Sequence, residues 1–98
     1  MKSVVASFAF LSVVILSNGA IAQARSATFS GRIARVWEDG FQLNTGKRSI
    51  TVDSYDICGD NTARHIKAGQ IATVTGEFEG GEFDAFSITK ANGKRACK

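Results

Sequence analysis

Strict alternation between apolar and polar residues on the two sides of a short turn is the feature that most constrains the fold of this chain. Phe41 and Leu43 are each followed by an amide residue, residues 45–47 form the turn, and polar residues flank Ile50 and Val52. An alternation of period two places one set of side chains on each face of a strand. The pattern predicts two antiparallel strands, residues 41–44 and 49–53, joined as a hairpin.

Three further segments are rich in β-branched and aromatic residues and are separated from their neighbours by glycine-containing turns. These predicted strands are residues 28–37, 70–78 and 83–90. Gly31 falls inside the first of them and is expected to mark a bend or bulge, because glycine is otherwise unfavourable in a strand.

The segment between residues 54 and 69 lacks alternation. Residues 61–67 suit at most two turns of helix, opened by Asn61 or Thr62 as N-cap and closed by Gly69. We therefore expect one short helix between the third and fourth strands.

This order of elements is that of a five-stranded Greek-key barrel of the OB type, so we predict an all-β fold with small α content. A chain of 98 residues allows only one domain. The predicted inward set is Phe29, Ile33, Val36, Phe41, Leu43, Ile50, Val52, Ile71, Val74, Phe78, Phe83, Ala85 and Ile88. Two packings remain open after Phe83, because Ala85 and Ile88 cannot share a face without a bulge.

The amino terminus has the features of a signal peptide. Lys2 precedes an apolar run at residues 4–16, which ends at a polar segment before it reaches the roughly 20 residues that a membrane span needs. Small residues then allow cleavage after Ala22 or Ala24, and no cysteine follows the run to carry a lipid. We predict a signal peptide at residues 1–24, an OB-like domain at residues 25–98, and a periplasmic or secreted protein without a membrane anchor.

Cys58 and Cys97 are the only cysteines of the chain. An even number of cysteines in an exported domain favours a disulfide, which would stabilise the fold by about 4 kcal/mol in the chain-entropy model. A metal site with His65 or a redox pair is the alternative, although the close CxxC spacing typical of both is absent.

The charge balance argues against nucleic acid as the partner. The whole chain has a formal net charge of +3, and loss of Lys2 with the leader lowers this to about +2, with the cations dispersed. The one basic cluster is Lys90, Lys94, Arg95 and Lys98. We expect this cluster to be a solvated and frayed C-terminus.

Candidate catalytic residues are few. His65 is the only histidine, and its basic surroundings suit a surface position rather than a catalytic dyad or triad. The carboxylates gather in the connector and around the last hairpin, where such side chains are normally solvated. We therefore expect no enzyme, no cofactor and no resident metal.

Glycines and apolar residues at strand spacing form the pattern G-x-x-V-x-V-x-G, which is followed by A-x-x-I. A known group of domains shares this pattern. The pattern is met at Gly69, Ala72, Val74, Gly76, Ala85 and Ile88, with Ala72 where valine is common. Residues 28–90 thereby resemble small secreted bacterial OB-fold-like domains of unknown function. They are more distantly similar to the bacterial OB-fold (BOF) periplasmic stress-tolerance proteins, whose acidic central motif is not matched. The resemblance implies a periplasmic binding or protective module.

We accordingly expect an exported, monomeric binding or stress-protective module whose partner is a small or polymeric ligand or a periplasmic protein. The alternatives are a binder of single-stranded nucleic acid or oligosaccharide, and a protein-interaction or inhibitory module. The predicted binding residues on the outer face of the second and third strands are Gln42, Asn44, Lys47, Arg48 and Thr51, and Trp37 is expected beside them at the entrance of the first loop. Trp37 has two interpretations, since it can stack on a flat polar ligand or close the barrel end as part of the core.

Overall fold

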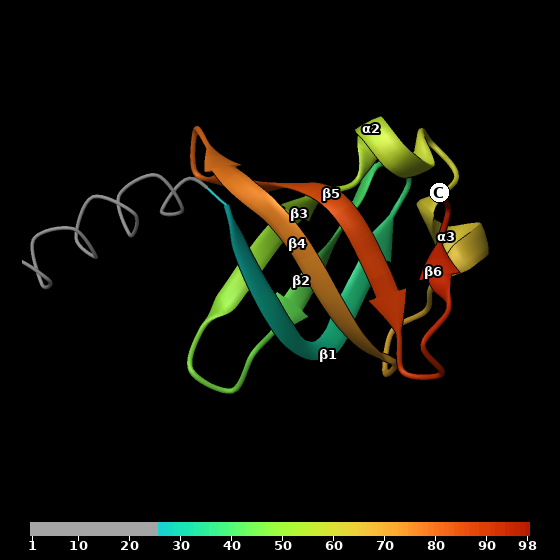
Figure 1. Cartoon of the computed structure of the whole chain (residues 1–98), viewed down its shortest axis with the longest axis horizontal. Coiled ribbons are helices and arrows are strands. Elements are labelled where there is room, and N and C mark those ends of the chain that lie inside the picture. Colours follow the sequence, from blue (N-terminus) through green and yellow to red (C-terminus); the bar gives the residue numbers. More distant parts are fainter. Residues whose placement is uncertain (1–25) are drawn as a thin grey trace, which may run out of the picture.

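The computed structural model describes residues 26–98, and the predicted signal peptide lies outside these residues (Figure 1). The elements are β1 (Ala27–Trp37), β2 (Gly40–Asn44), β3 (Ser49–Asp53), α2 (Tyr55–Cys58), α3 (Thr62–His65), β4 (Ile71–Glu79), β5 (Glu82–Lys90) and β6 (Arg95–Ala96). In the described part of the chain, no helix is both long enough and apolar enough to cross a membrane.

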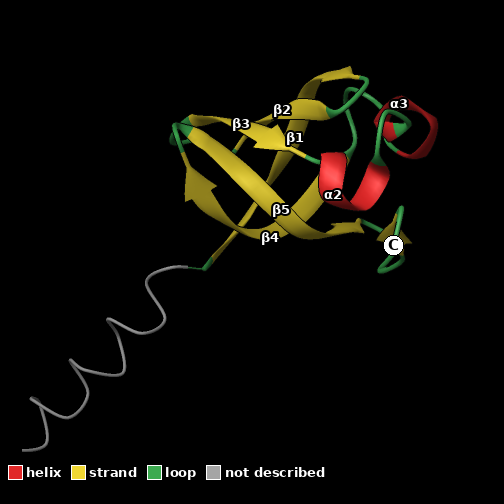
Figure 2. Ribbon diagram, turned by 90° about the horizontal axis from the view of Figure 1, so that it is seen from above, coloured by secondary structure: helices red, strands yellow, loops and turns green. Residues whose placement is uncertain are grey.

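The strands close into a five-stranded barrel, which confirms the predicted all-β, OB-like fold. The strand order is β3-β2-β1-β4-β5-β6, and a parallel pairing of β3 with β5 joins the two sides of the barrel. This seam consists of the pairs Val52↔Phe83 and Asp53↔Asp84. Seen from above, the strands cross around a common interior, with α2, α3 and the chain end gathered at one end of the barrel (Figure 2).

The long strand β1 belongs to both halves of the barrel. Its first half pairs with β4 and its second half with β2. Gly31 lies at the changeover, where a methyl group in place of its hydrogen would collide with the backbone carbonyl of Asn44. The bulge itself lies further along, at Ala34 between Ile33 and Arg35. Gly31 therefore permits the close crossing of β1 and β2, and the bulge changes which side chains face inward.

The core contains most of the predicted inward set. The buried hydrophobic residues of the strands are Ile33, Phe41, Leu43, Ile50, Val52, Ala72, Val74, Phe83, Ala85, Ile88 and Ala96, with Phe29 and Val36 packed against them. The prediction was wrong for Ile71, which is 42% exposed. Ile71 and Val74 are three residues apart on a strand, so they point to opposite faces, and Ala72 takes the inward position. Phe78 has the inward parity but is 45% exposed, next to the last residue of β4 and the β4–β5 turn.

The two packings left open after Phe83 are decided by a second bulge. Thr75 pairs with Ser87, and Gly76 pairs with Ala85, which leaves Phe86 as the extra residue of β5. The bulge shifts the parity, so that Ala85 and Ile88 are both buried.

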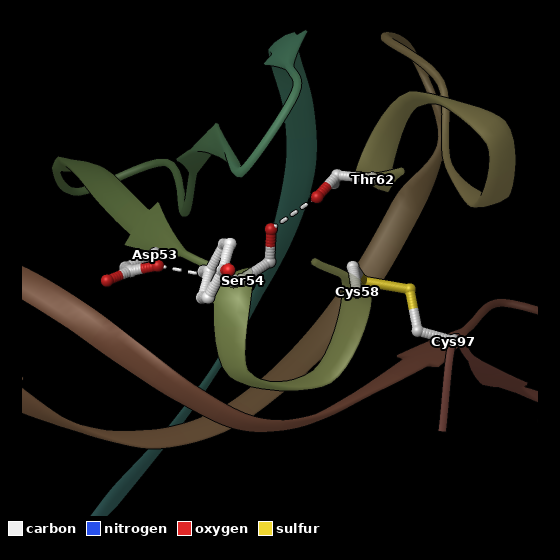
Figure 3. The surroundings of a disulfide bond; sticks show 6 residues. Asp53, Ser54, Cys58, Thr62 and Cys97 are labelled. Atoms are coloured by element: carbon white, nitrogen blue, oxygen red, sulfur yellow. Dashed lines mark hydrogen bonds between the residues drawn. A yellow bond between two sulfur atoms is a disulfide. The ribbon is translucent and has the colours of Figure 1, made fainter. Parts of the chain in front are cut away.

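The connector forms two short helices where one was predicted. The predicted helix shrinks to α3, and its C-terminal boundary is Ile66, not Gly69. Asn61 occupies the N-cap position without a side-chain cap hydrogen bond. The connector is held by buried polar contacts, including a 2.6 Å hydrogen bond between the hydroxyls of Ser54 and Thr62, both fully buried (Figure 3).

The C-terminal segment is fixed, in contrast to the prediction of a frayed end. β6 pairs with β5 through Ile88↔Ala96, and Ala96 is buried. Cys97 then forms the predicted disulfide with Cys58 at the end of α2 (Figure 3). Pairing and disulfide together hold the basic tail against the barrel.

Candidate functional site

The outer face of β1, β2 and β3 places three rows of side chains side by side. Arg35, Gln42 and Thr51 form one row across the strands, Trp37, Gly40 and Asp53 a second, and Arg32, Asn44 and Ser49 a third. At about 3.3 Å per residue, the distance from Gly40 to Asn44 along β2 is about 13 Å. We call the part formed by Arg35, Trp37, Gln42 and Thr51 the Trp37 surface.

Trp37 lies on this outer face and outside the hydrophobic core. Its indole covers Gly40, since a methyl group at Gly40 would lie only 2.7 Å from the indole Nε1. The guanidinium of Arg35 lies 5.5 Å from the centroid of the indole ring. A cation at this distance is attracted by the negative face of the ring and holds its orientation. The half-buried indole is thus a fixed aromatic platform at one end of the surface.

The amide side chains of this outer face, Gln42 and Asn44, are only partly used within the sheet. Gln42 donates a 2.6 Å hydrogen bond from Nε2 to the hydroxyl of Ser49, which leaves its carbonyl oxygen available. Asn44 accepts a 2.9 Å hydrogen bond from the backbone of Gly46, which leaves its NH₂ group available. Thr51 lies on β3, opposite Gln42. The face therefore offers both acceptors and donors.

Three predicted binding residues lie outside the Trp37 surface. Asn44 belongs to the row of Arg32 and Ser49. Lys47 is exposed in the turn between β2 and β3. Arg48 extends to the open end of the barrel, where its guanidinium lies 5.1 Å from the ring centroid of Phe78 and 5.5 Å from that of Phe29. The ring of Phe29 contacts the ring of Phe83 edge-on, and the ring of Phe78 is tilted against it. Arg48 thus covers an aromatic cluster.

A small acidic depression adjoins the indole. It has a volume of about 60 Å³ and is lined by Trp37, Asp39, Val52, Asp53 and Glu82. Its size suits one functional group of a ligand rather than a whole ligand, and its carboxylates repel phosphate groups.

The seam beside this depression concentrates negative charge. Burial, followed by the nearby Asp56, Asp53 and Glu79 carboxylates, raises the pKa of Asp84 above its usual 3.8. Carboxylates so placed accept hydrogen bonds from hydroxyl or cationic groups. The environment of the indole therefore favours a neutral or cationic ligand.

Sequence reasoning left Arg35 and the carboxylates of the depression outside the predicted site. Arg35 stands two residues before Trp37, and this period-two spacing was the available signal that both share a face. Asp53 and Glu82 come together only through the β3–β5 seam, which links distant segments.

His65 is exposed on α3. Within residues 26–98, no three His, Cys, Asp or Glu side chains are grouped so that they could hold a metal ion.

No family model, curated protein or solved structure matches the chain. The resemblance to bacterial OB-fold-like domains accordingly stays a prediction.

Proposed function

We propose that the mature domain is an exported, non-catalytic binding module that recognises an oligosaccharide on the Trp37 surface. The observation that carries this proposal is the position of the indole, which lies over Gly40 on the outer face, with Arg35 5.5 Å from its ring centroid. Sugar rings present apolar C–H faces that pack on such a ring, while their hydroxyls exchange hydrogen bonds with amides and carboxylates.

The charges around the indole support a saccharide over nucleic acid. A single strand would need a cationic groove along its phosphates. Here Asp39, Asp53 and Glu82 line the depression beside the ring, and Arg48 is directed to the other end of the barrel. Hydroxyl groups suit this environment, since they can donate to the carboxylates and accept from Arg35.

Titration of the intrinsic fluorescence tests this function, because Trp37 is the only tryptophan. Neutral chito- and cello-oligosaccharides are the probes. We expect the emission to change on binding, acrylamide quenching to decrease, and Trp37→Ala to lose binding while the circular dichroism spectrum is retained. Phe86→Ala is the matched control, since Phe86 is 50% exposed on β5 and does not belong to the surface.

Three results would overturn the saccharide assignment. Salt-dependent binding of single-stranded DNA without saccharide binding would favour the nucleic-acid alternative. Specific co-purification of a periplasmic protein, with neither ligand bound, would favour an interaction module. Loss of the fold in Trp37→Ala would give the indole a structural role.

Export of the protein is tested separately, by measuring its intact mass. The intact mass of the protein recovered from the periplasm or medium should correspond to a chain that begins at Gln23 or Arg25. Retention of residues 1–22 would contradict cleavage.

A further inference from the structure

The turn that precedes β4 and the turn that follows β5 lie close together (Figure 1). A cleft is formed by residues of these two turns and of the adjoining strand ends. Its volume is about 260 Å³, and its lining is Gln70, Ile71, Lys90, Ala91 and Asn92. The antiparallel pair Ala72↔Lys90 brings these two chain segments together. The β5–β6 turn is closed by a 2.8 Å hydrogen bond from the backbone N–H of Lys90 to the carbonyl of Lys94. The cleft shares no residue with the Trp37 surface.

The hydrogen bonds around the cleft fix the direction of both its amide side chains. The Oε1 atom of Gln70 accepts from the backbone N–H of Lys67 at 3.0 Å, and the Oδ1 atom of Asn92 accepts from that of Lys94 at 2.9 Å. Because a backbone N–H can only donate, the oxygen of each amide is the end engaged by the protein. Each amide therefore keeps its NH₂ group for another partner.

The charged groups at the cleft are also donors only. Lys90 is the one charged residue of the lining, and no carboxylate is among the lining residues. Arg32 pairs with Ile71 on the neighbouring strand, and its guanidinium donates a 2.7 Å hydrogen bond to the carbonyl of Gly69. This bond holds a second cation beside the cleft. An anion is the ligand charge that complements these groups.

Ile71 gives the cleft an apolar wall. Ile71 lines the cleft, and its side chain is 42% exposed. The volume is slightly below the usual range for small-molecule sites, which starts at about 300 Å³. We propose that this cleft binds a small organic carboxylate, whose carboxylate group accepts from Lys90 and the two amides and whose aliphatic part lies on Ile71.

NMR titration of the uniformly labelled protein with hexanoate tests the proposal. We expect shift changes at the side-chain NH₂ groups of Gln70 and Asn92 and at the methyl groups of Ile71, with a Kd of about 1 mM for so small a ligand. Binding should tighten from acetate to hexanoate, by about twofold for each partly buried methylene group. Hexylammonium, which has the same chain and the opposite charge, should leave these signals unchanged.

Variants separate the ionic and the apolar contributions. Lys90→Gln keeps most of the side-chain length and should weaken hexanoate binding about tenfold. Ile71→Thr keeps a β-branched residue and should abolish the dependence on chain length. Arg64→Gln removes an exposed cation of α3 outside the cleft and should leave hexanoate binding unchanged.

The carboxylate proposal is overturned if the cleft signals do not shift, if hexylammonium shifts them equally, or if Lys90→Gln binds hexanoate as tightly as the wild type. Inorganic phosphate binding as tightly as hexanoate would also overturn it. Since the two sites share no residue, saccharide binding tested with Trp37→Ala and hexanoate binding tested with Lys90→Gln fail or succeed independently.

Discussion

Loss of the disulfide between Cys58 and Cys97 is expected to remove about 4 kcal/mol from the free energy of unfolding. The two cysteines are separated by 39 residues, so the disulfide closes a loop that includes β4, β5 and β6. In the chain-entropy model, closing a loop of this length lowers the entropy of the unfolded chain enough to give this value at 25 °C. A domain of about 70 residues typically has a total stability of about 4–10 kcal/mol. The disulfide therefore accounts for a large share of the stability.

Urea unfolding of Cys58→Ala/Cys97→Ala beside the wild type measures this contribution. We expect the free energy of unfolding to fall by about 4 kcal/mol and the Tm to fall by roughly 15–30 °C. The wild type treated with reductant is the matched control, because it loses the disulfide without any change of sequence. A loss below about 1 kcal/mol in both samples would refute the loop-closure reasoning.

Three further predictions concern stability, each measured by urea unfolding. Ser54→Ala leaves the buried hydroxyl of Thr62 without its 2.6 Å partner and should lower the free energy of unfolding by about 1–3 kcal/mol. The double variant with Thr62→Val should lose less than the sum of the two single variants, and losses that simply add would contradict the pairing of the two hydroxyls. Gly76→Ala places a methyl group against the backbone carbonyl of Asp84 and should cost about 3 kcal/mol, whereas a change within about 0.5 kcal/mol would contradict this close contact. Asp84→Asn should stabilise the protein at about pH 7, because the raised pKa of Asp84 means that folding disfavours its charged form. The gain in stability should shrink as the pH falls towards about 4 and the wild-type carboxyl is protonated, and a gain that grows at low pH would contradict a raised pKa.

Alternation predicted the β2–β3 hairpin well because its strands carry the signal without interruption. The observed bounds of β3, Ser49–Asp53, are those expected, and the apolar residues of both strands are buried. Ile71 shows the limit of the same reasoning. Its hydrophobicity suggested an inward position, but it is three residues from the buried Val74 and therefore faces the opposite side of the strand. β6 has only two residues, which is too short for any periodic signal.

The sequence left the position of Trp37 open between the outer face and the core, because it depends on the bulge at Ala34. In a regular strand, Arg35 and Trp37 would share the inward face of Ile33. The bulge inserts one residue into β1 and reverses this parity, so that Val36 packs against the core and Trp37 faces outward. The inward prediction for both Ile33 and Val36, three residues apart, already required such a bulge.

Arg48 covers aromatic rings at one end of the barrel, and this restricts which residues position 48 tolerates. Arg48 lies across the rings of Phe29 and Phe78. A planar guanidinium can stack on two rings, whereas the ammonium group of lysine is a compact, strongly hydrated point charge. Lysine at position 48 would keep the charge and still uncover the rings. An uncovered aromatic end is a surface through which two copies of the domain can associate, so we expect arginine at this position to protect the protein from self-association.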